Sequence, residues 1–166
     1  MSLMRILVTG GLGFIASNLI KYILNEHSDA KITNVDNLST AANPANLKDI
    51  RKDTRYKFVK ADIAEPRIIS KLVKGAEVIV NSAAETHVDR SIANPQPFFK
   101  SNTQGTFTLL EAARKNNPKV RIVQASTDEI YGDILEGSFN EGQRLRPSNP
   151  YAASKAAGDI RARVYY

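Results

Sequence analysis

Short apolar runs rich in branched residues alternate along the chain with stretches of helical periodicity. The apolar runs predict strands at Arg5–Thr9, Lys31–Asp36, Tyr56–Val59, Val78–Asn81 and Val120–Ala125. Near-continuous runs of this kind are typical of parallel strands buried on both faces. The stretches between them predict helices at Phe14–Glu26, Ala45–Ile50, Pro66–Val73 and Phe98–Lys115. This order predicts an α/β fold with a Rossmann-like, doubly wound parallel sheet.

The end of the chain predicts one more helix, which begins after Asn149-Pro150 and continues to the last residue. Neither a capping Gly or Asn nor a proline follows it, and no sixth strand pairs beside Val120–Ala125. We therefore expect residues 1–166 to be a single Rossmann domain, incomplete at its C-terminal end, with a substrate domain lying outside this chain.

Composition narrows the class of protein. The chain is 42% hydrophobic and 24% charged, as in ordinary globular domains, and it has no cysteine. No apolar stretch reaches the roughly 20 residues that span a bilayer, so we expect a cytoplasmic protein without a membrane partner. The net charge of +6 comes from scattered lysines and arginines. That distribution argues against a nucleic-acid partner and favours a basic surface that attracts phosphorylated ligands.

A glycine-rich turn, Thr9-Gly10-Gly11-Leu12-Gly13-Phe14-Ile15-Ala16, joins the first strand to the first helix. This is the position of a dinucleotide-binding fingerprint. Gly10 would permit the tight turn, Gly13 would let the backbone approach a pyrophosphate, and Ala16 would allow close helix packing. The helix N-terminus offers free N–H groups to phosphates. The alternative is a purely structural turn.

Two acidic positions follow the next strands. Asp36 lies about 20 residues beyond the glycines, where a carboxylate accepts hydrogen bonds from the adenosine ribose and repels a 2′-phosphate. We therefore expect NAD and not NADP, although Asp36 could instead cap the following turn. Asp62-Ile63, after the third strand, is similarly placed to meet the adenine ring.

Tyr151 and Lys155 are four residues apart on the last predicted helix and so share one face. A nearby ammonium and a positive nicotinamide ring would lower the pKa of the tyrosine toward neutrality. Tyr151 is then a candidate general base for a sugar hydroxyl. The alternative is a partly buried packing tyrosine.

Ser126-Thr127-Asp128-Glu129 follows the fifth strand at the sheet edge where open α/β sheets bind ligands. Neighbouring strand residues point to opposite faces, so Asp128 and Glu129 serve one site only if the strand ends near Ser126. Two carboxyls in different surroundings can divide acid and base roles. A solvated acidic turn is an equal alternative.

The segment after the fourth strand begins with Ala83-Ala84, small residues that suit a chain passing over a flat cofactor. His87 and Asp89 follow, and for these we favour a structural role in a hydrogen-bonded loop over catalysis. Neither histidine has another histidine near it in sequence, so no metal site is expected.

Together these segments resemble the extended short-chain dehydrogenase/reductase family, and within it the 4,6-dehydratases of nucleotide sugars such as dTDP-glucose. The resemblance covers almost the whole chain. It is carried by Gly10–Asn18, Ala83–Ile92, Gly105-Thr106, Leu109–Arg114, Ser126–Gly132 and Asn149–Asp159. Thr127-Asp128-Glu129 is the most diagnostic, because related 4-epimerases usually lack the Asp-Glu pair.

The resemblance implies a nucleotide-sugar substrate and an ordered reaction. Tyr151 deprotonates the C4 hydroxyl while NAD takes the hydride, Asp128 and Glu129 eliminate water across C5 and C6, and the hydride returns to C6. Thr127 and Thr86 would contact the substrate. The residues assigned to NAD are Gly10, Gly13, Phe14, Ile15, Asp36, Asn37, Asp62, Ile63, Ala83, Ala84, Ser101, Tyr151 and Lys155. A 4-epimerase and a non-catalytic NAD-binding fragment are the alternatives.

Two departures from the family pattern concern packing. Ala16 replaces the last glycine of the fingerprint, and Thr103-Gln104 stands where an apolar residue is usual. The second departure could alter a helix face used in pairing. The helices from Phe98 and from Tyr151 carry apolar or small residues on more than one face, so we expect a homodimer.

Overall fold

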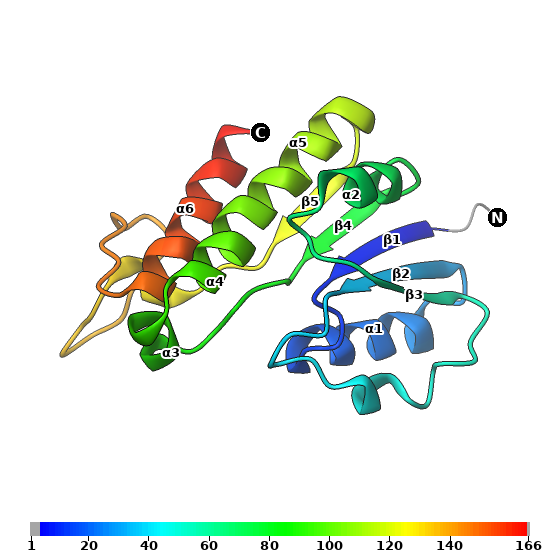
Figure 1. Cartoon of the computed structure of the whole chain (residues 1–166), viewed down its shortest axis with the longest axis horizontal. Helices are drawn as coiled ribbons and strands as arrows, with labels where there is room; N and C mark the ends of the chain where they lie inside the picture. Colours follow the sequence, from blue (N-terminus) through cyan, green and yellow to red (C-terminus); the bar gives the residue numbers. More distant parts are fainter. Residues whose placement is uncertain (1–3, 166) are drawn as a thin grey trace.

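A computed structural model describes residues 4–165 as a five-stranded parallel sheet with helices on both faces (Figure 1). The strands lie in the order β3-β2-β1-β4-β5, and each neighbouring pair is parallel. Their bounds are β1 Met4–Thr9, β2 Ala30–Asp36, β3 Tyr56–Lys60, β4 Val78–Asn81 and β5 Arg121–Gln124. The predicted doubly wound α/β fold is therefore confirmed.

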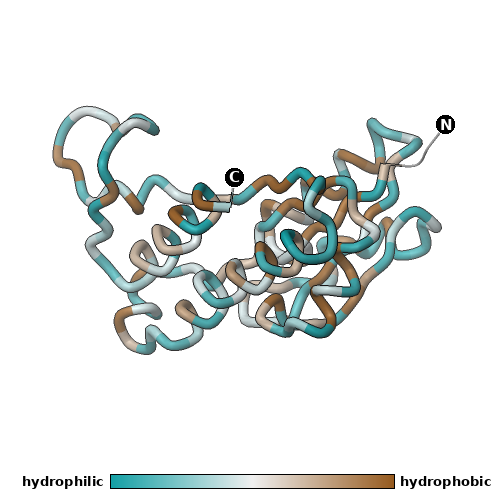
Figure 2. The backbone as a smooth tube through the Cα atoms, turned by 90° about the horizontal axis from the view of Figure 1, so that it is seen from above, coloured by the Kyte–Doolittle hydropathy of each residue, from teal (hydrophilic) through white to brown (hydrophobic). Residues whose placement is uncertain are grey.

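The central strand supplies residues to two cores. Successive strand side chains point to opposite faces. Ile6 and Val8 of β1 pack with Ile20 of α1 (Phe14–Glu26) on one face, and Leu7 packs with Ile69 of α2 (Pro66–Val73) on the other. The second core also contains Leu109 of α5 (Thr106–Asn116). Figure 2 shows the hydrophobic stretches concentrated where these strands and helices pack together.

Several shorter elements differ from the sequence expectations. The helix expected at Phe98–Lys115 consists of α4 (Gln96–Phe98), a π-helical segment η2 (Phe99–Gly105) and α5. The helix expected at Ala45–Ile50 is a 3₁₀-helix, η1 (Pro44–Leu47). Two elements had no prediction: α3 (Val88–Ala93) and a 3₁₀-helix, η3 (Asp128–Tyr131). All are short or irregular, so tertiary contacts rather than hydrophobic period decide them.

The last helix, α6, spans Pro150–Val164 and begins with Asn149 as its N-cap. The Asn149 side chain accepts a hydrogen bond from the Ala152 amide, and proline follows at the first helical position. The predicted start of this helix is therefore confirmed. It ends at Val164, with Tyr165 as its C-cap, and residue 166 lies outside the described part of the chain.

Candidate active site

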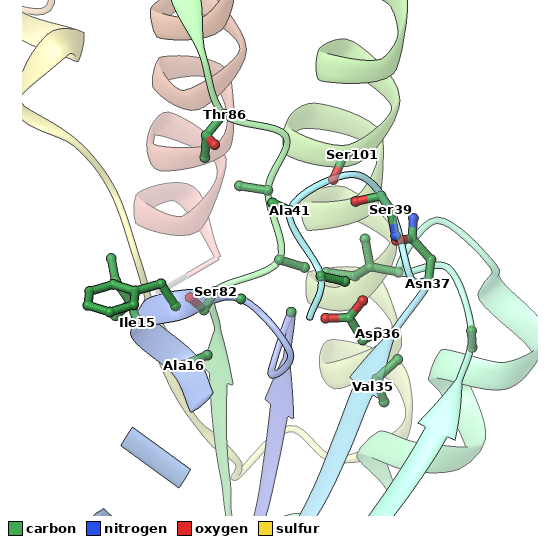
Figure 3. Close-up of a pocket in the computed structure, with 18 residues that line it drawn as sticks. Ile15, Ala16, Val35, Asp36, Asn37, Ser39, Ala41, Ser82, Thr86 and Ser101 are labelled. Carbon is green, nitrogen blue, oxygen red and sulfur yellow. The ribbon is translucent and has the colours of Figure 1, made fainter. Parts of the chain in front are cut away.

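A cleft of about 320 Å³ opens at the carboxyl ends of the central strands. The loops after β1, β2 and β4 form its walls, and Figure 3 shows Ile15 and Thr86 on one side with Asn37 and Ser39 on the other. Eleven of the residues predicted to bind cofactor or substrate line it: Gly10, Gly13, Phe14, Ile15, Asp36, Asn37, Ile63, Ala83, Ala84, Thr86 and Ser101. Its other lining residues are Ala16, Val35, Ser39, Ala41, Ala42, Ala61 and Ser82.

The glycine turn has the local geometry that its sequence predicts. Gly10 has φ of +68°, a conformation that L-residues with a side chain rarely adopt, and a Cβ there would lie 2.7 Å from the Ala83 Cα. The turn is also held by its neighbour strand, because the Gly11 amide donates to Oδ1 of the buried Asn34 at 3.0 Å. Gly10 is thus required both for the turn and for the narrow floor of the cleft.

The first turn of α1 faces this cleft without a capping side chain. Gly13 is the N-cap and makes no side-chain hydrogen bond, and the first turn holds no acidic residue. The backbone N–H groups at the start of the helix, in Phe14, Ile15 and Ala16, all belong to residues that line the cleft. An uncapped helix N-terminus of this kind favours an anionic ligand such as a diphosphate.

Asp36 is buried at the end of β2, and both of its carboxylate oxygens already accept hydrogen bonds. Oδ2 accepts from the Leu12 amide at 3.0 Å and Oδ1 from the Leu38 amide at 2.9 Å. The turn-capping alternative is therefore present in the structure. A carboxylate has about four acceptor positions and Asp36 lines the cleft, so the ribose role stays a prediction.

Asp62 lies beside the cleft instead of in its wall. It lines a neighbouring cavity of about 370 Å³ together with Asn37, Lys100 and Ser101. Burial raises the pKa of its carboxyl, but hydrogen bonds from Lys100, the Ala64 amide and Asn37 outweigh burial and leave the pKa below its ordinary value. The Lys100 ammonium stands 2.7 Å from Oδ2. Ile63, its neighbour in sequence, lines the cleft itself.

Asp128 and Glu129 can serve one site only if the fifth strand ends before them, and the structure meets this condition. β5 ends at Gln124, and the chain turns into η3 at Asp128, so the strict alternation of a strand no longer separates Asp128 from Glu129. Thr127 caps η3, and its hydroxyl accepts from the Glu129 amide at 3.4 Å. The Asn149 side-chain amide donates to Oε2 of Glu129 at 3.2 Å, which joins this turn to the start of α6.

Tyr151 and Lys155 are both buried in α6, and their pKa values move in the directions that burial dictates. Burial raises the pKa of Tyr151; a hydrogen bond with Thr127 opposes this shift, and the charges of Glu129 and Asp128 reinforce it. Burial lowers the pKa of Lys155. The Lys155 ammonium donates to the Ala125 carbonyl at 2.7 Å. Burial and the two carboxylates thus raise the pKa of Tyr151 in the protein without a ligand. The expected lowering involved a positive nicotinamide ring beside the phenol, so it stays a prediction.

Three residues that hold Tyr151 in place were missed by the sequence reasoning. Ser91 of α3 is fully buried, and its hydroxyl accepts from the Tyr151 amide at 3.0 Å. The Phe98 ring packs edge-on against the Tyr151 ring with centroids 6.3 Å apart. Asn102 bonds to Ser154 of α6 and to both backbone groups of Glu85. Their positions in sequence carry no periodic signal, so only the fold reveals them.

His87 and Asp89 lie at the start of α3. His87 is the N-cap of this helix, has φ of +101° and is exposed, while its carbonyl accepts from the Ser91 amide at 3.1 Å. Asp89 occupies the first turn of the same helix. This geometry fits the structural role favoured for the pair.

Residues 4–165 contain neither a cluster of metal ligands nor a helix that could span a membrane. No three side chains of His, Cys, Asp or Glu come together there as ligands for a metal ion. Within the same residues, every helix is too short or too polar to cross a membrane.

Comparison with known proteins identifies the family. A family model described as GDP-mannose 4,6 dehydratase matches residues 7–166. The chain belongs to the GDP-mannose 4,6-dehydratase family. Among curated members, the low-salt glycan biosynthesis protein Agl12 of Haloferax volcanii is 46% identical over 98% of this chain and 52% of its own length. The dTDP-glucose 4,6-dehydratase of Streptomyces niveus is 43% identical over 98% of this chain and 49% of its own.

Solved structures of the family agree with this assignment. DesIV, a dTDP-glucose 4,6-dehydratase from Streptomyces venezuelae solved with NAD and TYD bound, superposes with a TM-score of 0.92 at 44% identity. It covers 98% of this chain, which in turn covers 51% of DesIV. The chain therefore spans about half the length of the relatives it matches.

Proposed function

We propose that this chain is the cofactor-binding and catalytic half of an NAD-dependent 4,6-dehydratase that acts on a nucleotide-activated hexose, dTDP-glucose being the first candidate. The observation that carries the proposal is the link between η3 and α6, where the Asn149 side chain donates to Glu129 and the charges of Glu129 and Asp128 raise the pKa of Tyr151. An acidic pair and a tyrosine near each other, together with a cofactor cleft, are the groups that dehydration of a sugar would require.

The cleft fits NAD. The uncapped N-terminus of α1 would hold the diphosphate, Asp36 the adenosine ribose, and the Asp62–Ile63 segment the adenine. The narrow floor between Gly10 and Ala83, where a Cβ would collide, would let a flat ring system lie close to the backbone. When bound, NAD would supply the hydride acceptor for the sugar C4 and a positive charge near Tyr151.

The residues of the chain would divide the proton transfers among them. The Tyr151 phenol would take the proton of the C4 hydroxyl. Oxidation at C4 makes the C5 proton acidic, and the Glu129 carboxylate would remove it. Asp128 would give its proton to the C6 hydroxyl as that group leaves as water. Thr86 would contact the sugar from the opposite wall. Lys155, held by the Ala125 carbonyl, would place its ammonium on the Tyr151 side of α6.

We expect weak dehydration by this chain alone. Its curated relatives are about twice as long, and binding energy from the nucleotide end of a substrate normally supports chemistry at the reacting carbon. Joining the chain to the second half of the Streptomyces niveus relative should raise turnover. Turnover by the isolated chain equal to that of the joined protein would contradict this expectation.

The acidic pair provides the decisive experiment, performed in the joined protein. Glu129→Gln should slow exchange of the sugar C5 proton with solvent by about 100-fold, since a positioned general base contributes on this order. Asp128→Asn should slow loss of the C6 hydroxyl and leave C5 exchange measurable. Glu136→Gln, an exposed residue of the following loop, is the matched control. Full turnover by both amide variants would exclude dehydration and favour a 4-epimerase.

We also place a homodimer surface on α5 and α6. Phe107 and Ile160 are exposed large apolar residues there, with the Arg161 guanidinium 4.9 Å above the Phe107 ring. Apolar side chains exposed together on neighbouring helices favour pairing with a second copy. Sedimentation of the wild type and of Ile160→Glu tests this, and a monomeric wild type at all concentrations would refute it.

A further inference from the structure

The two walls of the cleft are connected by one arginine. Arg90 of α3 donates from Nη2 to the Thr40 hydroxyl at 3.1 Å, and the same nitrogen lies 3.6 Å from Oε2 of Glu85. Thr40 belongs to the loop after β2, whose residues Ser39, Ala41 and Ala42 line the cleft. Glu85 belongs to the opposite wall, between Ala84 and Thr86. Arg90 therefore bridges the loop of residues 37–43 to the segment of residues 83–86.

The two walls differ in how firmly the rest of the protein holds them. Glu85 is buried, and Asn102 binds both its amide and its carbonyl at 2.9 Å. Thr40 and Ala41, at the apex of the other wall, are exposed. Short-range bonds order the start of that loop, from the Leu38 amide to Asp36 and from the Ser39 amide to Asn37, and the Asn43 amide bonds to the Leu12 carbonyl at its end. Arg90 thus fastens an exposed loop to a fixed wall.

We propose that Arg90 and Thr40 form a clasp that retains the cofactor, which makes Arg90 a positioning residue for the bound dinucleotide. This inference rests on the proposed function, because it requires that NAD occupy the cleft. A loop that lines the ribose end of the cleft must move aside before a dinucleotide leaves. In the proposed reaction the hydride returns to the sugar, so NAD is restored in every turnover and has no need to dissociate. Slow release of NAD would therefore not lower the rate of turnover.

The same helix also reaches the catalytic side. Ser91, the next residue after Arg90, binds the Tyr151 amide. α3 therefore contacts the loop of residues 37–43 through Arg90 and the start of α6 through Ser91. Thr40 lies on the loop of residues 37–43, so a substitution at Thr40 tests the clasp without removing the contact between Ser91 and Tyr151.

The rate of cofactor release tests the clasp in this chain. NADH bound to the protein is displaced by excess NAD, and its fluorescence reports release. Thr40→Val removes the hydroxyl at nearly constant volume and should speed release about threefold, as expected for one partly exposed hydrogen bond to a charged group. Arg90→Met should speed it further, because the Glu85 contact is lost as well. Thr40→Ser keeps the hydroxyl and should release NADH at the wild-type rate.

The readouts separate a clasp from a merely structural effect. The clasp predicts faster release with an unchanged association rate in both variants and an unchanged melting temperature in Thr40→Val, because Arg90→Met also leaves the buried Glu85 without its partner. A double variant should release NADH no faster than Arg90→Met alone, since both substitutions break one contact. If the wild type binds NADH but Thr40→Val and Arg90→Met release it at the wild-type rate, the clasp is refuted and the proposed function stands. If calorimetry detects no binding of NAD or NADH to the wild type, both proposals fail.

Discussion

The proposed site has two sides, which differ in how far neighbouring strands enclose them. The cofactor side is the cleft at the glycine turn, and the catalytic side is the turn that carries Asp128 and Glu129. β1, which leads into the glycine turn, lies between β2 and β4, and its last four residues are buried. β5, which leads to the acidic pair, pairs only with β4 among the described strands, and Val123 in it is 50% exposed. The loop of residues 133–149 that follows is mostly exposed. Among the described residues, the strand that leads to the cleft thus has a neighbour on each side, whereas the strand that leads to the acidic pair has one.

Buried polar side chains connect the two sides. Asn81, at the end of β4, accepts from the Thr9 hydroxyl at 2.6 Å and donates to Gln124 at 2.7 Å, which ties β1 to β5. Asn102 ties the cleft wall at Glu85 to Ser154 of α6. Hydrogen bonds of this kind hold groups in register because a buried polar atom without its partner is costly. The catalytic side therefore depends on the cofactor side for its position.

The largest expected effect is on the cofactor side, at Gly10. Gly10→Ala should lower the free energy of unfolding by about 3 kcal/mol, because it adds the strain of a positive φ to a Cβ contact of 2.7 Å with the backbone of Ala83. Urea unfolding measures the loss, and calorimetry should show NAD binding abolished. Gly75→Ala is the matched control, since a Cβ there meets nothing within 4 Å. Equal effects of the two substitutions would refute this account of the turn.

A smaller effect is expected at Asn102, which connects the cleft wall at Glu85 to α6. Asn102→Ala leaves the amide and the carbonyl of Glu85 without their partner, removes one bond of the Ser154 hydroxyl and should cost about 2 kcal/mol. Hydrogen exchange should become faster in α6 and stay unchanged in α1. Asn18→Ala, at an exposed position of α1, is the control and should change stability by less than about 0.5 kcal/mol. Equal acceleration in both helices would mean that the two sides unfold as one unit.

The sequence predicted best where a regular period coincides with a clear boundary. The predicted bounds of α1, α2 and β4 are those of the structure, because glycine or proline precedes or opens each helix and β4 is an uninterrupted apolar run. The same reasoning located the cleft residues, since the turn after each parallel strand arrives at one edge of the sheet. Local pattern is sufficient there because the chain order itself dictates the neighbours.

Prediction failed where burial or a distant partner decides the outcome. The spacing of Tyr151 and Lys155 correctly puts both on α6, but it does not reveal that both side chains are buried, nor that burial raises the pKa of Tyr151 in the protein without a ligand. The π-helical segment and the roles of Ser91 and Asn102 depend on contacts between elements far apart in sequence. No periodicity within one segment encodes such contacts.

The smallest expected effect on stability concerns the ion pair of Lys100 and Asp62, which lines the cavity beside the cleft and forms the rim of the cofactor side. The lowered carboxyl pKa of Asp62 means that this pair stabilises the fold above the ordinary carboxyl value of 3.8 and that the contribution disappears as pH falls and Asp62 is protonated. The raised pKa of Lys100 means that the ammonium's contribution is present below 10.5 and is lost only as pH rises through the raised value. Both partners are therefore charged across neutral pH.

Lys100→Met tests this pair. At neutral pH it should lower the free energy of unfolding by about 0.5 kcal/mol, because the lysine is largely exposed and such pairs are screened by solvent. The difference from the wild type should shrink toward zero as pH falls through the lowered pKa of Asp62 and its carboxyl becomes protonated. Lys48→Met, an exposed lysine after η1, should show no such trend. A difference that stayed constant through the acid range would show that the Lys100 side chain stabilises the rim by packing and not by charge.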